Sequence, residues 1–276
     1  MDISLENIRN WVINKSIRNK SNGVVIINGL WRIRCLFQPT KHERFFNYHI
    51  LVAQTLGQGA CYYEKPELSD KILESMIGQE YKGYPTGNEN IDIALLDSLA
   101  ISFNSVPDFS IELPGLRSHK ALTRADIIVD EALRISNNIR NKKNRKVKVC
   151  IIGVVSLIVE KLLQSGFIVS ACDREKNLIG KKLFNKVIVE SATKSLDIIS
   201  NSDIAIITGM ALSTGTLSEL VSVARKNKTK IILFAQTGAG FAPFYIRNNI
   251  DSVVSEPFPF YTFDGHTKIN VYRAIK

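Results

Sequence analysis

Short apolar runs alternate with amphipathic stretches through the second half of the chain. The apolar runs are typical of strands buried on both faces, and polar stretches with helical spacing follow most of them. Strands that alternate with helices form a parallel sheet covered on both sides, and right-handed crossovers make it doubly wound. The pattern therefore predicts a Rossmann-like domain over residues 147–255. Its expected strands are residues 147–153, 167–172, 187–189, 203–208, 230–235 and 252–255, and its expected helices are residues 157–164, 196–199, 216–227 and 244–248.

The first half has a different pattern, in which β-rich runs are grouped together. Two such runs, residues 24–28 and 31–37, flank an Asn28–Gly29 pair that is typical of a hairpin turn. We expect a smaller α+β domain at residues 1–122, followed by the Rossmann-like domain at residues 123–276. The other expected elements are a strand or strand pair within residues 45–65 that turns at residues 57–59, helices at residues 2–19, 67–77, 90–105 and 123–139, and a loop at residues 106–122.

The composition is that of a globular protein with a basic surface. Hydrophobic residues make up 45% and charged residues 22% of the 276 positions, which is enough apolar material for a core. The formal net charge is +10, and the densest basic cluster covers residues 140–148. This cluster could contact phosphate groups or could be a solvated linker between the domains. We favour the linker and expect no nucleic-acid partner, because no nucleic-acid module or interleaved aromatic residue accompanies the cluster.

The cysteines and the N-terminal segment indicate the compartment. The four cysteines form no CxxC pair, and their spacing matches no zinc module. Unpaired cysteines of this kind are usual in a reducing compartment. The N-terminal segment carries charges throughout, and no uncharged apolar stretch of about 18 residues occurs, so we expect neither a signal peptide nor a membrane span. The expected location is the cytoplasm.

Glycine, serine and threonine gather where the predicted parallel strands end. Ligands of open α/β sheets bind beyond the carboxyl ends of the strands. Glycine lets backbone N–H groups approach an anion closely, and hydroxyl groups add donors. Tight turns need the same residue types without any ligand, but Thr-Gly steps at several strand ends favour a binding site. The candidate ligand-binding residues are Gly153, Asp173, Thr208, Gly209, Met210, Ser213, Thr214, Gly215, Thr216, Glu219, Gln236, Thr237 and Gly238.

The turn after the first predicted strand keeps one glycine of a dinucleotide fingerprint. The sequence there runs Gly153-Val-Val-Ser-Leu, which is not GxGxxG. Asp173 lies 20 residues beyond Gly153, where the ribose-binding acid of a nicotinamide site falls. A charged residue also commonly ends a second strand, so NAD is a minor alternative. The sequence contains neither a Walker loop nor a GxSxG elbow.

The candidate acid–base and metal-binding groups are scattered along the sequence. No histidine has HxxxH spacing or a neighbouring soft ligand, so a metal site would need several of them to meet acids such as Glu219 or Asp173. Glu219 could cap backbone N–H groups or could act as a general base or ligand, and we favour the structural role. The sequence defines no catalytic residue and no cofactor. The histidines are His42, His49, His119 and His266.

The stretch Thr208-Gly-Met-Ala-Leu-Ser-Thr-Gly-Thr-Leu-Ser-Glu219 resembles a segment of a known family. It is similar to the Thr-Gly, then Gly-Thr-Leu, segment of the DUF364 family, which is described as a heavy-metal chelation family. The resemblance implies a Rossmann-like second domain and a first domain similar to the N-terminal domain of enolase. Residues 24–37, 57–62 and 91–104 look like the counterparts of that first domain.

These features favour a small-molecule enzyme or binding protein of metal-related or secondary metabolism. Its ligand, an anionic metabolite or a metal chelate, is expected in a cleft between the domains, against residues 208–216 and 236–240. Two alternatives stay open, namely a protein that binds metal ions directly and an enzyme that uses a nucleotide cofactor such as NAD or S-adenosylmethionine. A homodimer is compatible with each of them.

Overall fold

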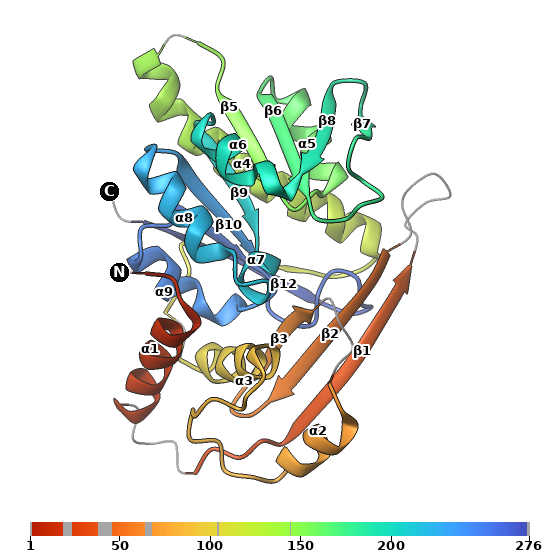
Figure 1. Ribbon diagram of the computed structural model, residues 1–276, viewed down its shortest axis with the longest axis vertical. Helices are drawn as coiled ribbons and strands as arrows, with labels where there is room; N and C mark the ends of the chain where they lie inside the picture. Colours follow the sequence, from red (N-terminus) through yellow and green to blue (C-terminus); the bar gives the residue numbers. More distant parts are fainter. Residues whose placement is uncertain are drawn as a thin grey trace.

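The computed structural model describes residues 2–18, 24–37, 46–63, 68–103, 105–143 and 145–274. Within these ranges the chain forms a nine-stranded sheet and a three-stranded sheet. Figure 1 shows the larger sheet, with its helices, above the smaller one. The smaller sheet therefore lies against one end of the larger sheet rather than beside it.

The larger sheet contains six parallel strands at its centre. The bounds of its strands are β4 Phe109–Leu113, β5 Lys148–Ile152, β6 Ile168–Asp173, β7 Lys182–Leu183, β8 Val187–Ser191, β9 Ile204–Thr208, β10 Lys230–Ala235, β11 Ser252–Ser255 and β12 Thr267–Arg273. Their order is β4-β12-β11-β10-β9-β5-β6-β8-β7, and β12, β4 and β7 are antiparallel to their neighbours. The parallel strands follow the order of a Rossmann fold, with the topological switch point between β5 and β9. The predicted doubly wound sheet is confirmed.

Helices cover both faces of the larger sheet because successive strand residues point to opposite sides. Val149 and Ile151 belong to the hydrophobic cluster on one face, and Cys150 and Ile152 belong to the cluster on the other. The helices of this half are α4 Arg117–Lys143, α5 Ser156–Gln164, α6 Ser195–Ser200, α7 Met210–Ser213, α8 Leu217–Lys226 and α9 Ala242–Arg247, with short turns η1 Ala192–Lys194 and η2 Ala239–Phe241. Helices α4 and α5 pack on the first face, and α6, α8 and α9 pack on the second (Figure 1). No described helix, the 27-residue α4 included, has the length and apolar character to cross a membrane.

The smaller sheet is an antiparallel meander with helix α3 across one face. Its elements are β1 Gly29–Phe37, β2 Phe46–Gln54 and β3 Gln58–Tyr63, with helices α1 Leu5–Arg18, α2 Asp70–Met76 and α3 Glu89–Ile101. Alternate residues of the sheet, such as Leu51 and Cys61, pack with Leu95 of α3 in the same core as the second face of the larger sheet. The predicted turn at residues 57–59 lies where β2 meets β3, and the expected strand pair is confirmed.

The predicted hairpin at Asn28–Gly29 is wrong. β1 begins at Gly29 and pairs with β2, whereas the residues before it pair with the segment after α2 through an isolated bridge. There the Ile27 N–H donates to the Gln79 carbonyl (3.0 Å). The next N–H, that of Asn28, donates to the Gln54 carbonyl (2.8 Å). The chain thus passes from one partner to the next without reversing, because each extended run finds a distant partner.

Two neighbouring strands of the larger sheet, the edge strand β4 and the adjacent β12, come from segments for which the pattern predicted no regular structure. Four of the five β4 residues are exposed or half-exposed, so the strand has almost no apolar signal. Because β4 lies within residues 106–122, the larger sheet takes a strand from before the expected domain boundary at residue 122. The two domain ranges stay a prediction.

Candidate functional site

The switch point of the larger sheet brings two predicted residues together. Gly153 follows β5 with a φ of 88°, a conformation that favours glycine. A Cβ atom at this position would lie 2.4 Å from the Thr208 hydroxyl oxygen at the end of β9. The two turns therefore touch, and Gly153 is needed both for its conformation and for the close approach of Thr208.

Asp173, at the end of β6, fastens the same turn to the neighbouring strand. Its Oδ2 atom accepts a hydrogen bond from the Val154 N–H (2.7 Å), and its Oδ1 atom accepts one from the Glu175 N–H (2.8 Å). Both carboxylate oxygens are thus bonded to backbone donors. Asp173 has the sequence spacing from Gly153 that is typical of a ribose-binding acid, but its carboxylate here stabilises backbone turns.

The segment after Thr208 runs from the switch point toward the loop after β10. Gly209 is buried, its N–H donates to the Phe234 carbonyl (2.7 Å), and a Cβ atom there would lie 2.9 Å from the Thr237 carbonyl oxygen. Met210 then begins α7 and packs with Phe258 in the cluster on the free face of the smaller sheet. Glycine at position 209 therefore permits two strand-end loops to lie in contact.

The hydroxyl groups that follow in this loop mostly bond within it. Ser213 Oγ donates to the Met210 carbonyl (3.1 Å), and Thr214 and Thr216 share a hydroxyl–hydroxyl bond of 3.1 Å. Gly215, by contrast, is exposed, has a φ of 70°, and would have open space around an added Cβ atom. Glu219 also lies exposed, in the first turn of α8. The loop has its own internal structure, and its tip faces solvent.

The loop after β10 forms the junction between the two sheets. Thr237 is 1% exposed, and its Oγ1 atom accepts the Tyr62 N–H of β3 (3.0 Å). The Gly238 N–H donates to the Ala60 carbonyl of the same strand (3.4 Å). Thr237 and Gly238, which the sequence suggested as ligand contacts, are therefore bonded to the smaller sheet. Gln236, directly before Thr237, is half-buried and points to a different partner.

A buried carboxylate of α3 completes this junction. Asp97 accepts the Ala60 N–H at Oδ2 (2.8 Å) and the Gly240 N–H at Oδ1 (2.6 Å). Burial raises the pKa of Asp97 to about 7, and the two backbone donors oppose the rise. Sequence reasoning missed this residue, because a single acid on an otherwise apolar helix gives no sign of a partner 143 positions away.

A second buried network holds Gln236, and sequence reasoning missed it as well. Gln236 Nε2 donates to Glu256 Oε2 (2.9 Å), and Arg124 of α4 lies 3.6 Å from the same oxygen. The Arg124 guanidinium stacks 3.7 Å from the centre of the Tyr261 ring. Burial raises the pKa of Glu256, and Arg124 opposes the rise. Two features of the sequence could have indicated this network. Arg124 is a charged residue on the apolar face of α4, and Glu256 is an acid directly after β11.

The described residues do not fit a resident heavy-metal ion. No group of three or more His, Cys, Asp or Glu side chains lies together among them. The soft ligands are also unsuitable, because burial raises the pKa of Cys150 and of Cys172 to about 12, which keeps both thiols protonated at neutral pH. His266 pairs with Glu112 (3.0 Å) at an exposed edge. His42 lies outside the described residues.

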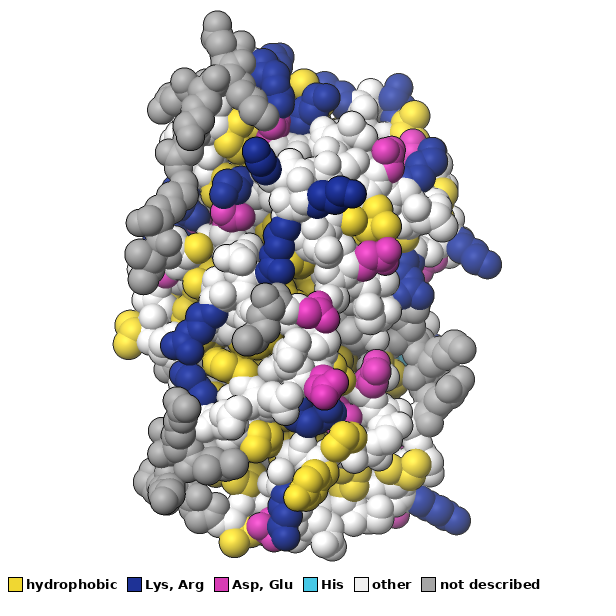
Figure 2. Space-filling view, turned by 60° about the vertical axis from the view of Figure 1, so that its left-hand side comes forward, with side chains coloured by type: hydrophobic (Ala, Val, Ile, Leu, Met, Phe, Trp, Pro, Cys, Tyr) yellow, Lys and Arg dark blue, Asp and Glu magenta, His cyan; other side chains and the backbone are white. Residues whose placement is uncertain are grey.

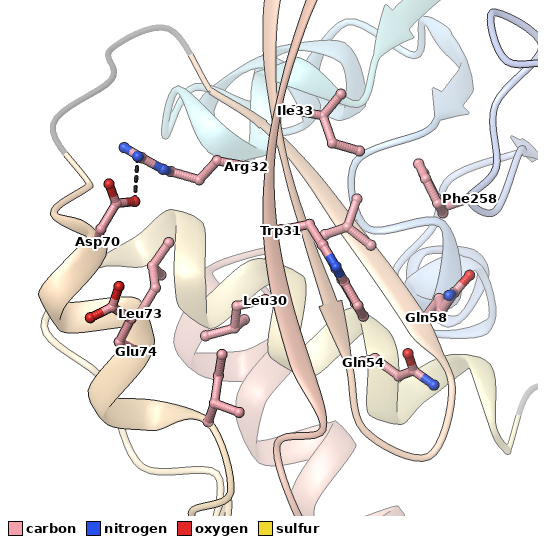
Figure 3. A pocket seen from close by; sticks show the side chains of 12 residues that line it. Leu30, Trp31, Arg32, Ile33, Gln54, Gln58, Asp70, Leu73, Glu74 and Phe258 are labelled. Atoms are coloured by element: carbon pink, nitrogen blue, oxygen red, sulfur yellow. Dashed lines mark hydrogen bonds and ion pairs between the residues drawn. The ribbon is translucent and has the colours of Figure 1, made fainter.

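Two cavities of the described structure are lined by residues other than the predicted ligand-binding ones. A cavity of about 660 Å³ borders the smaller sheet, and Figure 3 shows the side chains that line it. Phe258 lines this cavity and packs in the same hydrophobic cluster as Met210, which is one of the predicted ligand-binding residues. A smaller one, of about 240 Å³, lies beside α2 and the segment that follows it.

Basic side chains do not gather at one place on the face that Figure 2 shows. Lys and Arg are spread there among acidic and polar side chains. Within the basic cluster, Arg145 forms two hydrogen bonds to the Asp203 carboxylate (2.8 and 2.7 Å). The structure does not describe the side chains of residues 140–144, so the linker role of the cluster stays a prediction.

The strand order and the switch point define a Rossmann-like α/β protein with a small antiparallel unit at one end of its sheet. Residues 137–238 match the model of the DUF364 family, whose description reads "Putative heavy-metal chelation". The resemblance to this family is thereby confirmed, and the match covers most of the larger sheet's parallel strands.

Two solved structures of DUF364 proteins of unknown function share the fold over nearly the whole chain. The one from Desulfitobacterium hafniense DCB-2 has 13% identity and a TM-score of 0.54, with 96% of this chain and 98% of that chain covered. The one from Pyrococcus horikoshii has 12% identity and a TM-score of 0.51, with 98% and 99% covered. No curated protein sequence matches the chain. The likeness of the first unit to an enolase domain stays a prediction.

Proposed function

We propose that the protein binds a small anionic metabolite, free or as a metal chelate, at the switch point beside Gly153 and Thr208. The strand order carries this proposal, because the neighbouring ends of β5 and β9 are where Rossmann-like sheets bind ligands. The two turns meet there without a side chain at position 153 between them.

The start of α5 supplies the chemistry for an anion. Val155 occupies the N-cap position and has no side-chain acceptor, so it cannot cap the helix. The N–H groups of Ser156 and Leu157 have no acceptor among the described residues. Uncapped N–H groups and the positive end of the helix dipole favour a phosphate or carboxylate group. Ser156 and Val155 are half-buried, so solvent reaches this end of the helix.

The metal of the family description enters the proposal as part of the ligand. The described residues do not provide a donor set for a resident ion, whereas a carboxylate-rich or phosphate-rich metabolite brings its own oxygen donors. The protein would then recognise the anionic periphery of the chelate. Metal analysis of untagged protein together with native mass spectrometry would separate a bound ion from a bound chelate.

Pyrophosphate is a suitable probe, and Ser156→Pro is the variant that tests the site. Proline is favoured at the first position of a helix, so this change removes one N–H donor at little cost to α5. We expect calorimetry to show pyrophosphate binding that weakens about ten- to a hundredfold in the variant, since a hydrogen bond to a charged group contributes about 1.5–3 kcal/mol. Glu89→Pro is the matched control, because Glu89 holds the same position in α3 and is exposed.

Two results would contradict the proposal. The first is a wild-type protein that does not bind pyrophosphate, and the second is equal affinity in the wild type and Ser156→Pro. A loss of affinity in Glu89→Pro as large as that in Ser156→Pro would show that the effect is not specific to α5.

A nucleotide cofactor is the second candidate, and the strand order favours it, since dinucleotides bind at this switch point in Rossmann folds. The turn keeps Gly153, but both Asp173 oxygens accept backbone hydrogen bonds. If a nucleotide is the ligand, NAD or S-adenosylmethionine should bind more tightly than pyrophosphate and should compete with it.

A further inference from the structure

β1 is the terminal strand of the smaller sheet, and a cavity runs along its outer edge. Four successive residues, from Leu30 to Ile33, line the cavity of about 660 Å³. Successive strand residues point to opposite faces, so a cavity that meets all four must border the strand edge-on. In Figure 3, Leu30 and Arg32 point toward α2, whereas Trp31 and Ile33 point to the other face. Among the described residues, no strand pairs with this edge.

We call this cavity the edge groove. Its walls are apolar on both sides of β1. Leu73 and Ile77 line it on the α2 side, and Val52 and Phe258 line it on the opposite face. Trp31 is 44% exposed, which is high for its size and for its place in a sheet. An exposed, largely apolar edge strand with a groove on both faces is a template for another strand.

We propose that this edge pairs with β1 of a second copy of the chain, antiparallel about a two-fold axis at Arg32. The two smaller sheets would then form one six-stranded sheet. In this register Trp31 lies opposite the partner's Ile33, a pair of an aromatic and a β-branched residue that stabilises neighbouring strands. The same register places Leu30 opposite the partner's Arg34. The contact is isologous, as expected for a closed dimer.

The charges of the groove support a second copy in this register. Its lining holds the ion pair Arg32–Asp70 and one further acid, Glu74, so the groove carries a net negative charge. Glu74 lines the same cavity as Leu30, the residue that the partner's Arg34 would face. Arg34 is exposed, and its described bond is to the Asn47 amide oxygen (3.2 Å). The partner's arginine would thus meet an acid.

Neighbouring registers are less favourable for the same residues. An axis at Ile33 would place Arg32 opposite the partner's Arg34 on both sides of the axis, which makes two destabilising like-charge contacts where the proposed register has one. An axis at Trp31 would move Arg34 beyond the groove, opposite the partner's Asn28. In the proposed register the two Arg32 side chains meet at the axis, but each has its own Asp70.

Sedimentation equilibrium of the full chain tests this dimer. We expect a reversible monomer–dimer equilibrium, with a dissociation constant at least tenfold higher in Trp31→Lys than in the wild type. Leu122→Lys is the matched control, because Leu122 is 45% exposed on α4, away from the groove. A wild-type protein that stays monomeric at about 100 μM, or a dimer that Trp31→Lys leaves unchanged, would overturn the proposal.

A charge swap tests the register without touching the apolar contacts. Arg34→Glu and Glu74→Arg should each weaken the dimer several-fold, since each creates two like-charge contacts. Combined in one chain, they should restore the wild-type dissociation constant, because the swapped charges again face each other. Both side chains are exposed, so the single variants should fold normally. Additive weakening in the double variant would rule out this register.

Discussion

The loops after β9 and after β10 have the same chemistry in the sequence and opposite surroundings in the structure. Each begins near a Thr-Gly step at the carboxyl end of a parallel strand. The first loop ends in Gly215, which faces solvent, whereas the second places Thr237 at 1% exposure against β3. Residue types at a strand end therefore predict a turn, and the neighbouring unit decides whether that turn is available to a ligand.

The neighbour that makes the difference is the smaller unit. β3 and α3 lie against the loop after β10, and Asp97 joins both with hydrogen bonds to Ala60 and Gly240. The loop after β9 reaches the smaller unit mainly through apolar side chains of α7, with Met210 on one face of β3 and Leu212 on the other. Among the described residues, its one hydroxyl contact there is the Ser213 hydrogen bond to the Cys61 side chain, whereas the loop tip stays exposed. The three predictions below test this contrast, from the largest expected effect to the smallest.

Asp97 should make the stability of the junction depend on pH. Its folded-state pKa of about 7 lies above the unfolded value, so between about pH 4 and pH 7 the folded state binds more protons. The free energy of unfolding should therefore fall as pH rises through this window, by up to about 4 kcal/mol from this group. Denaturant titrations at several pH values should show this slope in the wild type and a flatter one in Asp97→Asn.

The comparison of slopes, rather than of absolute stabilities, isolates this carboxyl group. Asparagine keeps one acceptor oxygen but turns an amide donor toward the second backbone N–H, so the variant has its own cost at every pH. The Gly215→Ala protein, which keeps Asp97, should retain the wild-type slope. Equal slopes in the wild type and Asp97→Asn would show that Asp97 does not titrate in this window.

Gly240→Ala should destabilise the junction through a steric clash. The added Cβ atom would lie 2.9 Å from the Ile101 amide nitrogen and 3.0 Å from the Asp97 carbonyl oxygen, and both are backbone atoms of α3. Overpacking against a backbone that cannot move easily costs about 3 kcal/mol. The free energy of unfolding from denaturant titration should fall by this amount. A loss below about 1 kcal/mol would mean that α3 and this loop can separate at little cost.

The sequence predicts the larger sheet well because its central strands are continuous apolar runs. Residues 204–208 and 230–235 are buried on both faces, and no alternative structure accommodates such runs as easily. The edge strand β4 lacks this signal, since one of its five residues is buried. Asn28–Gly29 carries a strong turn signal, but long-range partners on either side keep the chain extended there. Local pattern thus fails where distant pairing decides.

The candidate site likewise contains features that the sequence predicts and features that it does not. The meeting of Gly153 with Thr208 follows from the rule that parallel strands end at one edge of the sheet, so the sequence suffices for it. The buried groups Asp97 and Arg124 could not be predicted, because each is a single charge on an apolar helix face with partners far along the chain. Their role exists only once the two units are packed.

Gly215→Ala should have the smallest effect of the three substitutions. The residue adopts a φ of 70°, and no atom lies within 4 Å of an added Cβ, so the cost is conformational rather than steric. An L-residue in the left-handed region costs about 1 kcal/mol, roughly a third of the loss expected for Gly240→Ala. Denaturant titrations of the two variants, run side by side, measure this ratio. Equal losses would mean that the tip of the first loop is as tightly packed as the second, and the contrast between open loop and buried junction would be wrong.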